Sequence, residues 1–364
     1  AADGGWAWAR LVGLLLLGYA VWMPVSMGLW AYTRWSLLWG LLLVLAANTI
    51  LIFWLGRRTD AASDRRISAA LGRGWTTLRA HVLSHWRAML ITEALFLAAF
   101  TFMAVLRAFN PDLWQPFWGG EKPFEFGLLN AILRSPMMPP YDPFFSDGAI
   151  NYYYYGLFLA SVPIKATGIN PAVGFNLVIA TLFAFTFIGA FAVVARLSGR
   201  LRYGLVGSAF VVLLGNLAAA FPVGWGQGLG PVREALQGGL SGFGERLGSW
   251  FVGPSRVIAS DKLMTINEFP FWSYLFADLH PHLIAMPIAL LCIALAFELF
   301  EGWPLSYKRR GWLPLAARWG LAALALGALA ITNSWDLPTY ALLLAGAVAG
   351  RAWRTRTPAR RFAT

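Results

Sequence analysis

Residues 119–156 read GGEKPFEFGLLNAILRSPMMPPYDPFFSDGAINYYYYG, and this polar stretch divides a chain whose other segments are mostly apolar. Its charged side chains precede four consecutive tyrosines, and they are Glu121, Lys122, Glu125, Arg134, Asp142 and Asp147. Long connections between regular elements usually carry function. We therefore expect this stretch to form half of an active site at the membrane surface.

The composition around this stretch is that of a membrane protein. Of 364 residues, 58% are hydrophobic and 13% are charged, about half the charged share of a soluble domain. Several apolar runs reach the ~20 residues needed to cross a bilayer, whereas the short alternating segments of a membrane barrel do not appear. We predict an all-α, polytopic transmembrane helical bundle, with residues 1–364 as one integral domain of the cell membrane.

The net charge of +12 is concentrated in a few short segments. Residues 56–87 carry seven arginines against two aspartates, which indicates the cytoplasmic side. Part of this segment is either an amphipathic helix on anionic headgroups or a solvated loop. Because the basic residues follow the pattern of membrane topology, we do not expect a nucleic-acid partner; membrane lipids are the expected surroundings.

Apolar runs predict about eight crossings, at 8–30, 35–55, 88–109, 172–195, 203–222, 281–301, 314–332 and 337–353. A further apolar run, 152–168, is interrupted by Pro163, Lys165 and Gly168. If this run is a re-entrant or broken helix, the basic segments after 195 and around 308–310 lie in the cytoplasm. The same topology puts two long loops, 110–151 and 223–280, on the external side.

Three smaller features complete the layout. The chain opens AADGG without a methionine, so we treat both ends as cuts in a longer chain and the first apolar run as a retained span. Glu93 lies within the third span, either near enough to the interface to be solvated or with a functional role. Cys292, the one cysteine, lies in an apolar run and is expected to be a packing residue.

Residues 278–282, Asp-Leu-His-Pro-His, place three ligand-type side chains within five positions. Carboxylate and imidazole groups suit a divalent ion, here Mg²⁺ or Mn²⁺, held by Asp278, His280 and His282. They equally suit acid–base chemistry or contact with a substrate phosphate. Asp278 has a structural alternative as the cap of the following helix. The residues alone leave these roles open.

The four tyrosines at 152–155 have two interpretations. Tyrosines concentrate at headgroup depth, where the ring is in apolar surroundings and the hydroxyl is wet. Alternatively, Tyr152, Tyr153, Tyr154 and Tyr155 form a platform for an apolar or sugar-bearing substrate.

Three separated motifs carry a resemblance to a known family. The stretch 119–156, FWSYLFADLHPH at 271–282 and TNSWDLPTY at 332–340 resemble the YYY family of multi-pass membrane proteins from filamentous green bacteria and archaea. The resemblance covers essentially the whole chain and implies no established activity; members are generally longer.

That family is in turn similar, more weakly, to the GT-C class of membrane glycosyltransferases. The similarity implies an acidic motif early in the first external loop, followed by a surface helix and a membrane dip. Glu121 falls at the class's Asp-Glu pair, with Gly120 in the first position, and 152–157 falls at its Pro-Pro-Leu-Tyr-Tyr segment. Because Gly120 departs from the pair, the base is either Glu121 or Glu125.

The similarity to the GT-C class implies, as the leading hypothesis, an external glycosyltransferase that uses a polyprenyl-phosphate sugar. Glu121 or Glu125 would be the base, assisted by Asp278 and His280. Substrate contacts are expected from the remaining polar groups of this side: Lys122, Arg134, Asp142, Tyr152, Tyr153, Tyr154, Tyr155, His282 and Asp336. The alternative is a non-catalytic scaffold among partner membrane subunits, because 19 tryptophans and 26 phenylalanines suit packing. A transporter fits less well, since polar groups gather at one face.

Overall fold

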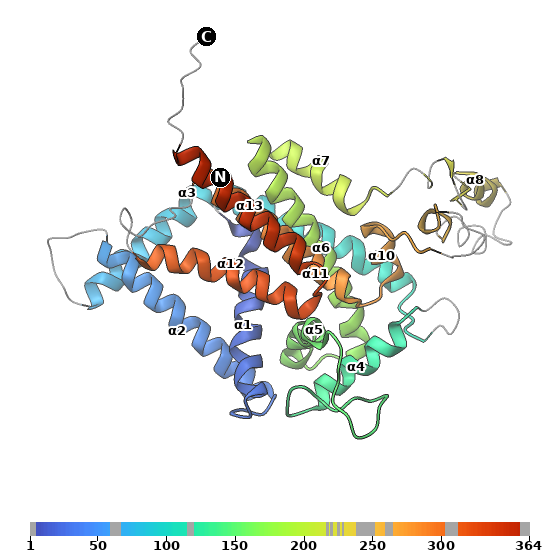
Figure 1. The fold of residues 1–364 in the computed structure, drawn as a ribbon, viewed down its shortest axis with the longest axis horizontal. Helices are drawn as coiled ribbons and strands as arrows, with labels where there is room; N and C mark the ends of the chain where they lie inside the picture. Colours follow the sequence, from blue (N-terminus) through green and yellow to red (C-terminus); the bar gives the residue numbers. More distant parts are fainter. Residues whose placement is uncertain are drawn as a thin grey trace, which may run out of the picture.

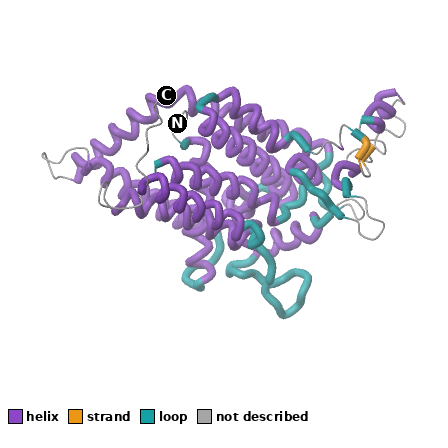
Figure 2. Tube along the Cα trace, turned by 45° about the horizontal axis from the view of Figure 1, so that its top comes forward, coloured by secondary structure: helices purple, strands orange, loops and turns teal. Residues whose placement is uncertain are grey.

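The computed structural model describes residues 5–58, 67–114, 120–215, 218, 221–223, 226–227, 229–237, 252–258, 265–302 and 312–356. Within these residues the regular structure is helical apart from one antiparallel pair of two-residue strands, β1 (Pro222–Val223) and β2 (Gly226–Gln227). The predicted all-α helical membrane bundle is confirmed. The helices pack into one bundle, and the connection between α4 and α5 protrudes from one end of it (Figures 1 and 2).

Six helices of the described chain are long and apolar enough to cross a bilayer. They comprise η1 (Trp6–Trp8) with α1 (Ala9–Ser26), most of α2 (Arg34–Arg58), α3 (Ile67–Phe109), α6 (Pro171–Ser198), α11 (Pro281–Glu301) and most of α12 (Trp312–Thr332). The helices at the two other expected crossings, 203–222 and 337–353, are not among these six. Helix α7 (Leu201–Val212) ends ten residues before the predicted boundary and is short, and α13 (Leu337–Arg356) has arginines in its last two turns.

Helix α3 corrects the expected boundary of the third span. Instead of beginning near residue 88, it runs unbroken for 43 residues, about 65 Å at the usual helical rise. Residues 67–87, about two thirds of the basic segment 56–87, are therefore the start of this helix. Helix α2 packs closely against this first part of α3, because a Cβ at Gly74 would overlap the Ile52 carbonyl.

Glu93, also on α3, is paired with Arg10 and accepts a hydrogen bond from the Trp6 indole at 2.7 Å.

Helix α5 (Tyr154–Thr167) has the properties expected of a re-entrant segment. Its 14 residues reach about 21 Å, less than the ~30 Å of a bilayer core. Nine of them are buried, so protein surrounds the helix. At its end the Lys165 ammonium donates to the Leu133 carbonyl at 2.8 Å, and Gly168 makes the left-handed turn before α6.

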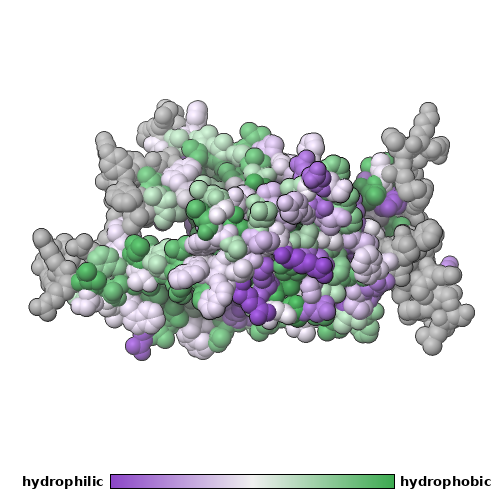
Figure 3. Space-filling view, turned by 90° about the horizontal axis from the view of Figure 1, so that it is seen from below, coloured by the Kyte–Doolittle hydropathy of each residue, from purple (hydrophilic) through white to green (hydrophobic). Residues whose placement is uncertain are grey.

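The core lies around α6 and α11, and the lipid-facing surface is on α2 and α3. In α6, 72% of the membrane-spanning window is buried, against 17% in both α2 and α3. The short helix α10 (Pro270–Phe276) is fastened to this core by Tyr274, whose hydroxyl lies 2.6 Å from Thr186 Oγ1 and 3.1 Å from the Leu182 carbonyl. Seen from below, hydrophilic residues gather right of centre between apolar patches (Figure 3).

Helix α4 (Lys122–Arg134) is amphipathic and packs one face on the bundle. Leu128, Leu129 and Ile132 are fully buried, and Lys122 and Glu125 lie on the same face. Helices α4 and α10 therefore bring two distant stretches of the chain to the same place. The remaining described elements are α8 (Gly230–Gln237) and η3 (Gly253–Ser255).

The topology can be tested with single cysteines, because the native Cys292 is fully buried. We expect Ser146→Cys, on the exposed α4–α5 connection, to react with a membrane-impermeant maleimide in intact cells. Thr77→Cys, exposed in the basic half of α3, should react only after permeabilisation. Labelling of both variants in intact cells would contradict this orientation.

Candidate functional site

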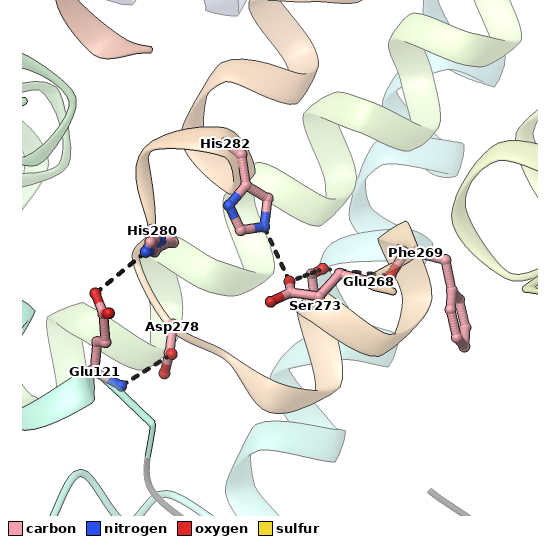
Figure 4. Close-up of polar contacts among 7 residues, drawn as sticks. All are labelled: Glu121, Glu268, Phe269, Ser273, Asp278, His280 and His282. Atoms are coloured by element: carbon pink, nitrogen blue, oxygen red, sulfur yellow. Dashed lines mark hydrogen bonds and ion pairs between the residues drawn. The ribbon is translucent and has the colours of Figure 1, made fainter. Parts of the chain in front are cut away.

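The start of α4 meets the segment between α10 and α11, 157 residues later in the chain (Figure 4). The backbone N–H of Glu121 donates to Asp278 Oδ2 at 3.1 Å. Gly120 permits this approach, since its φ is +60° and a Cβ there would lie 2.5 Å from Asp278 Oδ2 and overlap the Phe276 ring. The close approach of the two segments thus gives a structural reason for glycine at position 120.

Lys122 and Asp278 form a buried ion pair at this junction. Lys122 Nζ lies 3.5 Å from Asp278 Oδ1 and 4.5 Å from the centre of the Phe276 ring. Burial, more than any other influence, lowers the pKa of Lys122 and raises the pKa of Asp278 to about 6. The Lys122 charge opposes the rise at Asp278, so the two groups stabilise each other's ionised forms.

Glu125 lies one helical turn inside α4 and is completely buried. Neither of its carboxyl oxygens makes a hydrogen bond of ordinary geometry with the described residues. Burial, followed by the charges of Asp278 and Glu121, raises the pKa of Glu125 well above its usual value. The backbone N–H of Leu279 and the Lys122 ammonium oppose this only in part. A buried carboxylate in such surroundings requires a proton or a cation.

His280 lies between the buried junction and the solvent-accessible cavity. Its Nε2 lies 3.2 Å from Glu121 Oε2, and the Glu121 side chain is more than half exposed (Figure 4). Burial and the neighbouring His282 lower the pKa of His280, which favours the neutral imidazole at pH 7. A neutral imidazole can accept a proton or bind a metal ion.

His282 forms a second polar group with Glu268 and Ser273. Its Nε2 lies 3.1 Å from Glu268 Oε2, and the Ser273 hydroxyl donates to the same oxygen at 2.7 Å (Figure 4). Burial is the largest influence on Glu268, yet the hydrogen bonds from His282 and Ser273 together lower the pKa of this carboxyl. Sequence reasoning missed Glu268, although it begins the same aromatic run that contains the histidines.

Both polar groups line one cavity of about 300 Å³. Its polar lining comprises Glu121, Asp278, His280, His282, Glu268, Ser273 and Arg256. Sequence reasoning missed Arg256 as well; its guanidinium donates to the Ser255 hydroxyl at 2.7 Å. The hollow thus combines carboxylates, imidazoles and a guanidinium, a set that can move protons and hold an anionic group.

The groups placed to share a metal ion differ from those expected. One ligand atom each from Glu121, Glu125 and His280 lie within 4.8 Å of one another. Of the expected set, His280 alone belongs to this cluster. Asp278 is engaged by Lys122 and the Glu121 backbone, and His282 by Glu268.

The four tyrosines do not share one environment. Tyr152 packs edge-on against Phe124, and burial followed by the charges of Glu121 and Glu125 raises the pKa of Tyr152 to about 12. Tyr153 contacts Tyr152, whereas the Tyr154 hydroxyl accepts from the Trp22 indole at 3.2 Å. Tyr155 is buried against α1. The charges of Glu121 and Glu125 thus act on Tyr152, the first of the four.

Three further predicted substrate contacts have other surroundings. Arg134 is exposed at the far end of α4, about 18 Å along the helix from Lys122. Asp142 closes a turn in the α4–α5 connection, where it accepts from the Phe144 backbone N–H at 2.8 Å. Asp336, between α12 and α13, accepts from the Asn333 side chain at 3.0 Å.

Comparison with known proteins gives one family. A family model described as an uncharacterised membrane protein, DUF2298, matches residues 16–362. No curated protein and no solved structure matches the chain. The match bears on the membrane assignment and not on the YYY or GT-C resemblance, so an activity has to be argued from the site.

The junction can be tested with a matched pair of glycines. Gly28 and Gly120 both have left-handed φ values, +71° and +60°, but a Cβ at 28 would meet nothing within 4 Å. Gly28→Ala should therefore cost only the left-handed penalty, about 1–2 kcal/mol. Gly120→Ala should cost more, because it also displaces Phe276 and Asp278. Thermal unfolding in detergent measures both; equal losses would contradict the close approach.

Proposed function

The chain belongs to this family of uncharacterised membrane proteins, and from that premise we propose that it is a membrane glycosyltransferase. It transfers a sugar from a polyprenyl-phosphate donor to an acceptor hydroxyl at the external face of the cell membrane. One observation carries the proposal. A water-accessible carboxylate, Glu121, and an imidazole, His280, meet at 3.2 Å in a polar cavity beside the bundle.

The proposed sugar transfer makes one bond, breaks one bond and moves one proton. The acceptor oxygen forms a bond to the sugar's anomeric carbon, and the bond from that carbon to the phosphate oxygen breaks. The phosphate leaves with the bonding electron pair, and Glu121 takes the acceptor proton. Glu121 is the better base of the two candidates, because it lines the cavity whereas Glu125 is fully buried. His280 orients the Glu121 carboxylate.

The departing phosphate requires positive charge, which the site offers. Arg256 lines the cavity, and the buried Lys122 contributes its charge from behind Asp278, with which it is paired at 3.5 Å. Positive groups that face developing negative charge in a shielded site stabilise the transition state. Arg134, one of the expected substrate contacts, lies too far along α4 to reach this phosphate, so the proposal adds Arg256.

The bundle also offers a place for an apolar tail. A cavity of about 250 Å³ between α3 and α6 is lined by alanine, valine, leucine and proline side chains together with Arg107 and Asn176. The Arg107 charge interacts with both Lys122 and Asp278. Its buried Nη2 has no hydrogen-bond partner among the described residues. An amphiphile with an anionic head and a hydrocarbon chain matches this combination.

The exposed face of α2 and α3 favours a second candidate, a scaffold subunit without catalysis. Four tryptophans on these two helices are exposed: Trp35, Trp39, Trp75 and Trp86. Such a face suits lipids or partner helices. Loss of sugar transfer on a conservative change at the site separates the two functions.

We expect Glu121→Gln to reduce sugar transfer by roughly 10²–10⁴-fold, the usual contribution of a general base. The amide keeps the size of the side chain and the backbone bond to Asp278. The assay uses purified protein in liposomes that contain radiolabelled polyprenyl-phosphate hexoses and extracted membrane acceptors. It measures the label transferred to the acceptor fraction.

Glu298→Gln serves as the matched control, because this exposed carboxylate pairs with Arg196 on α6 instead of lining the cavity. It should transfer sugar at the wild-type rate. Equal rates for Glu121→Gln and wild type would remove Glu121 from the mechanism. Absence of transfer by the wild type, with co-purifying membrane subunits, would favour the scaffold.

A further inference from the structure

The environment of Glu125 is not accounted for by sugar transfer alone. Its side chain lies on the buried face of α4, within the cluster formed with Glu121 and His280, and it has no exposed surface. Both of its oxygens are without a hydrogen bond of ordinary geometry in the described part of the chain. A second carboxylate, Glu121, lies one helical turn away. Two carboxylates in this position repel each other unless one of them is protonated or a cation lies between them.

We propose that Glu121, Glu125 and His280 bind a divalent cation. Their ligand atoms already lie within 4.8 Å of one another. Oxygen and nitrogen ligands at about 2.1 Å from a metal lie at most about 4.2 Å apart, so a small closing movement completes the site. The exposed side chain of Glu121 gives the ion a path from the cavity.

The other polar groups nearby are less suited to the ion. Asp278 already has Lys122 as its counter-charge, at 3.5 Å. His282 shares its hydrogen bond with Glu268, whose carboxylate also accepts from Ser273. The Nε2 of His280 lies against Glu121, inside the cluster, and its buried Nδ1 has no partner in the described residues. The cluster thus uses the groups whose bonding capacity remains open.

Two carboxylates and one imidazole favour manganese among the common divalent ions. Carboxylates suit Mg²⁺, Ca²⁺ and Mn²⁺, whereas imidazole suits later transition metals. Mn²⁺ accepts both ligand types, and water molecules in the cavity can fill its remaining positions. If Glu121 binds through one oxygen, its other oxygen stays free for a proton. The cation site therefore goes beyond the proposed sugar transfer and does not depend on it.

Binding can be measured without any substrate. We expect the purified protein, stripped with a chelator, to bind one Mn²⁺ per chain in a titration followed by the electron paramagnetic resonance of free Mn²⁺. Glu125→Gln and His280→Ala should each weaken binding by at least about tenfold. His282→Ala, which removes a neighbouring imidazole outside the cluster, should bind as the wild type does.

Thermal unfolding provides the control for folding. Glu125→Gln replaces the buried carboxyl with a neutral side chain of the same size, so the metal-free variant should be at least as stable as the wild type. Added MnCl₂ should raise the unfolding midpoint of the wild type and of His282→Ala, but not of Glu125→Gln. A wild type that binds no Mn²⁺ at millimolar concentration would overturn the proposal. So would equal binding by Glu125→Gln, or a loss in His282→Ala as large as in His280→Ala.

Discussion

The arrangement of the candidate site depends on one junction, in which Asp278 binds the start of α4. This carboxylate accepts from the Glu121 backbone and pairs with Lys122, and it joins segments 157 residues apart. Removing one partner of a buried ion pair typically costs about 3–5 kcal/mol, although the intact pair adds little net stability. The pair therefore acts chiefly on position: it determines where Glu121 and Glu125 lie relative to His280.

Packing of α10 and α11 within the bundle holds this junction in place. Tyr274 fastens α10 to the most buried helix, α6, and His280 directly precedes α11. Side chains placed at the ends of well-packed helices are held more accurately than side chains in free loops. The apolar helices α2 and α3, of whose spanning windows only 17% is buried, contribute membrane anchoring.

Concentrating acids, imidazoles and cations in one partly buried place has an energetic cost. The raised pKa values of Asp278 and Glu125 and the lowered pKa of Lys122 all express burial of charge. Such clusters occur preferentially where a protein binds or transforms a ligand, because a stable core would use apolar residues instead. In the two proposals above, binding of a cation or of an anionic substrate would offset part of this cost.

Hydropathy and charge alone were sufficient for the membrane class, for most span positions and for the short helix α5. Hydropathy and charge are sums over residues that are neighbours in the sequence, so the sequence alone is enough to calculate them. The same patterns missed the continuity of α3 and the burial of Tyr155 against α1, since both depend on packing between helices. The residue types of the site were visible in the sequence, but their pairing was not. Only the tertiary structure joined Glu121 to His280 and gave His282 to Glu268, because those contacts depend on how α4, α10 and α11 pack together.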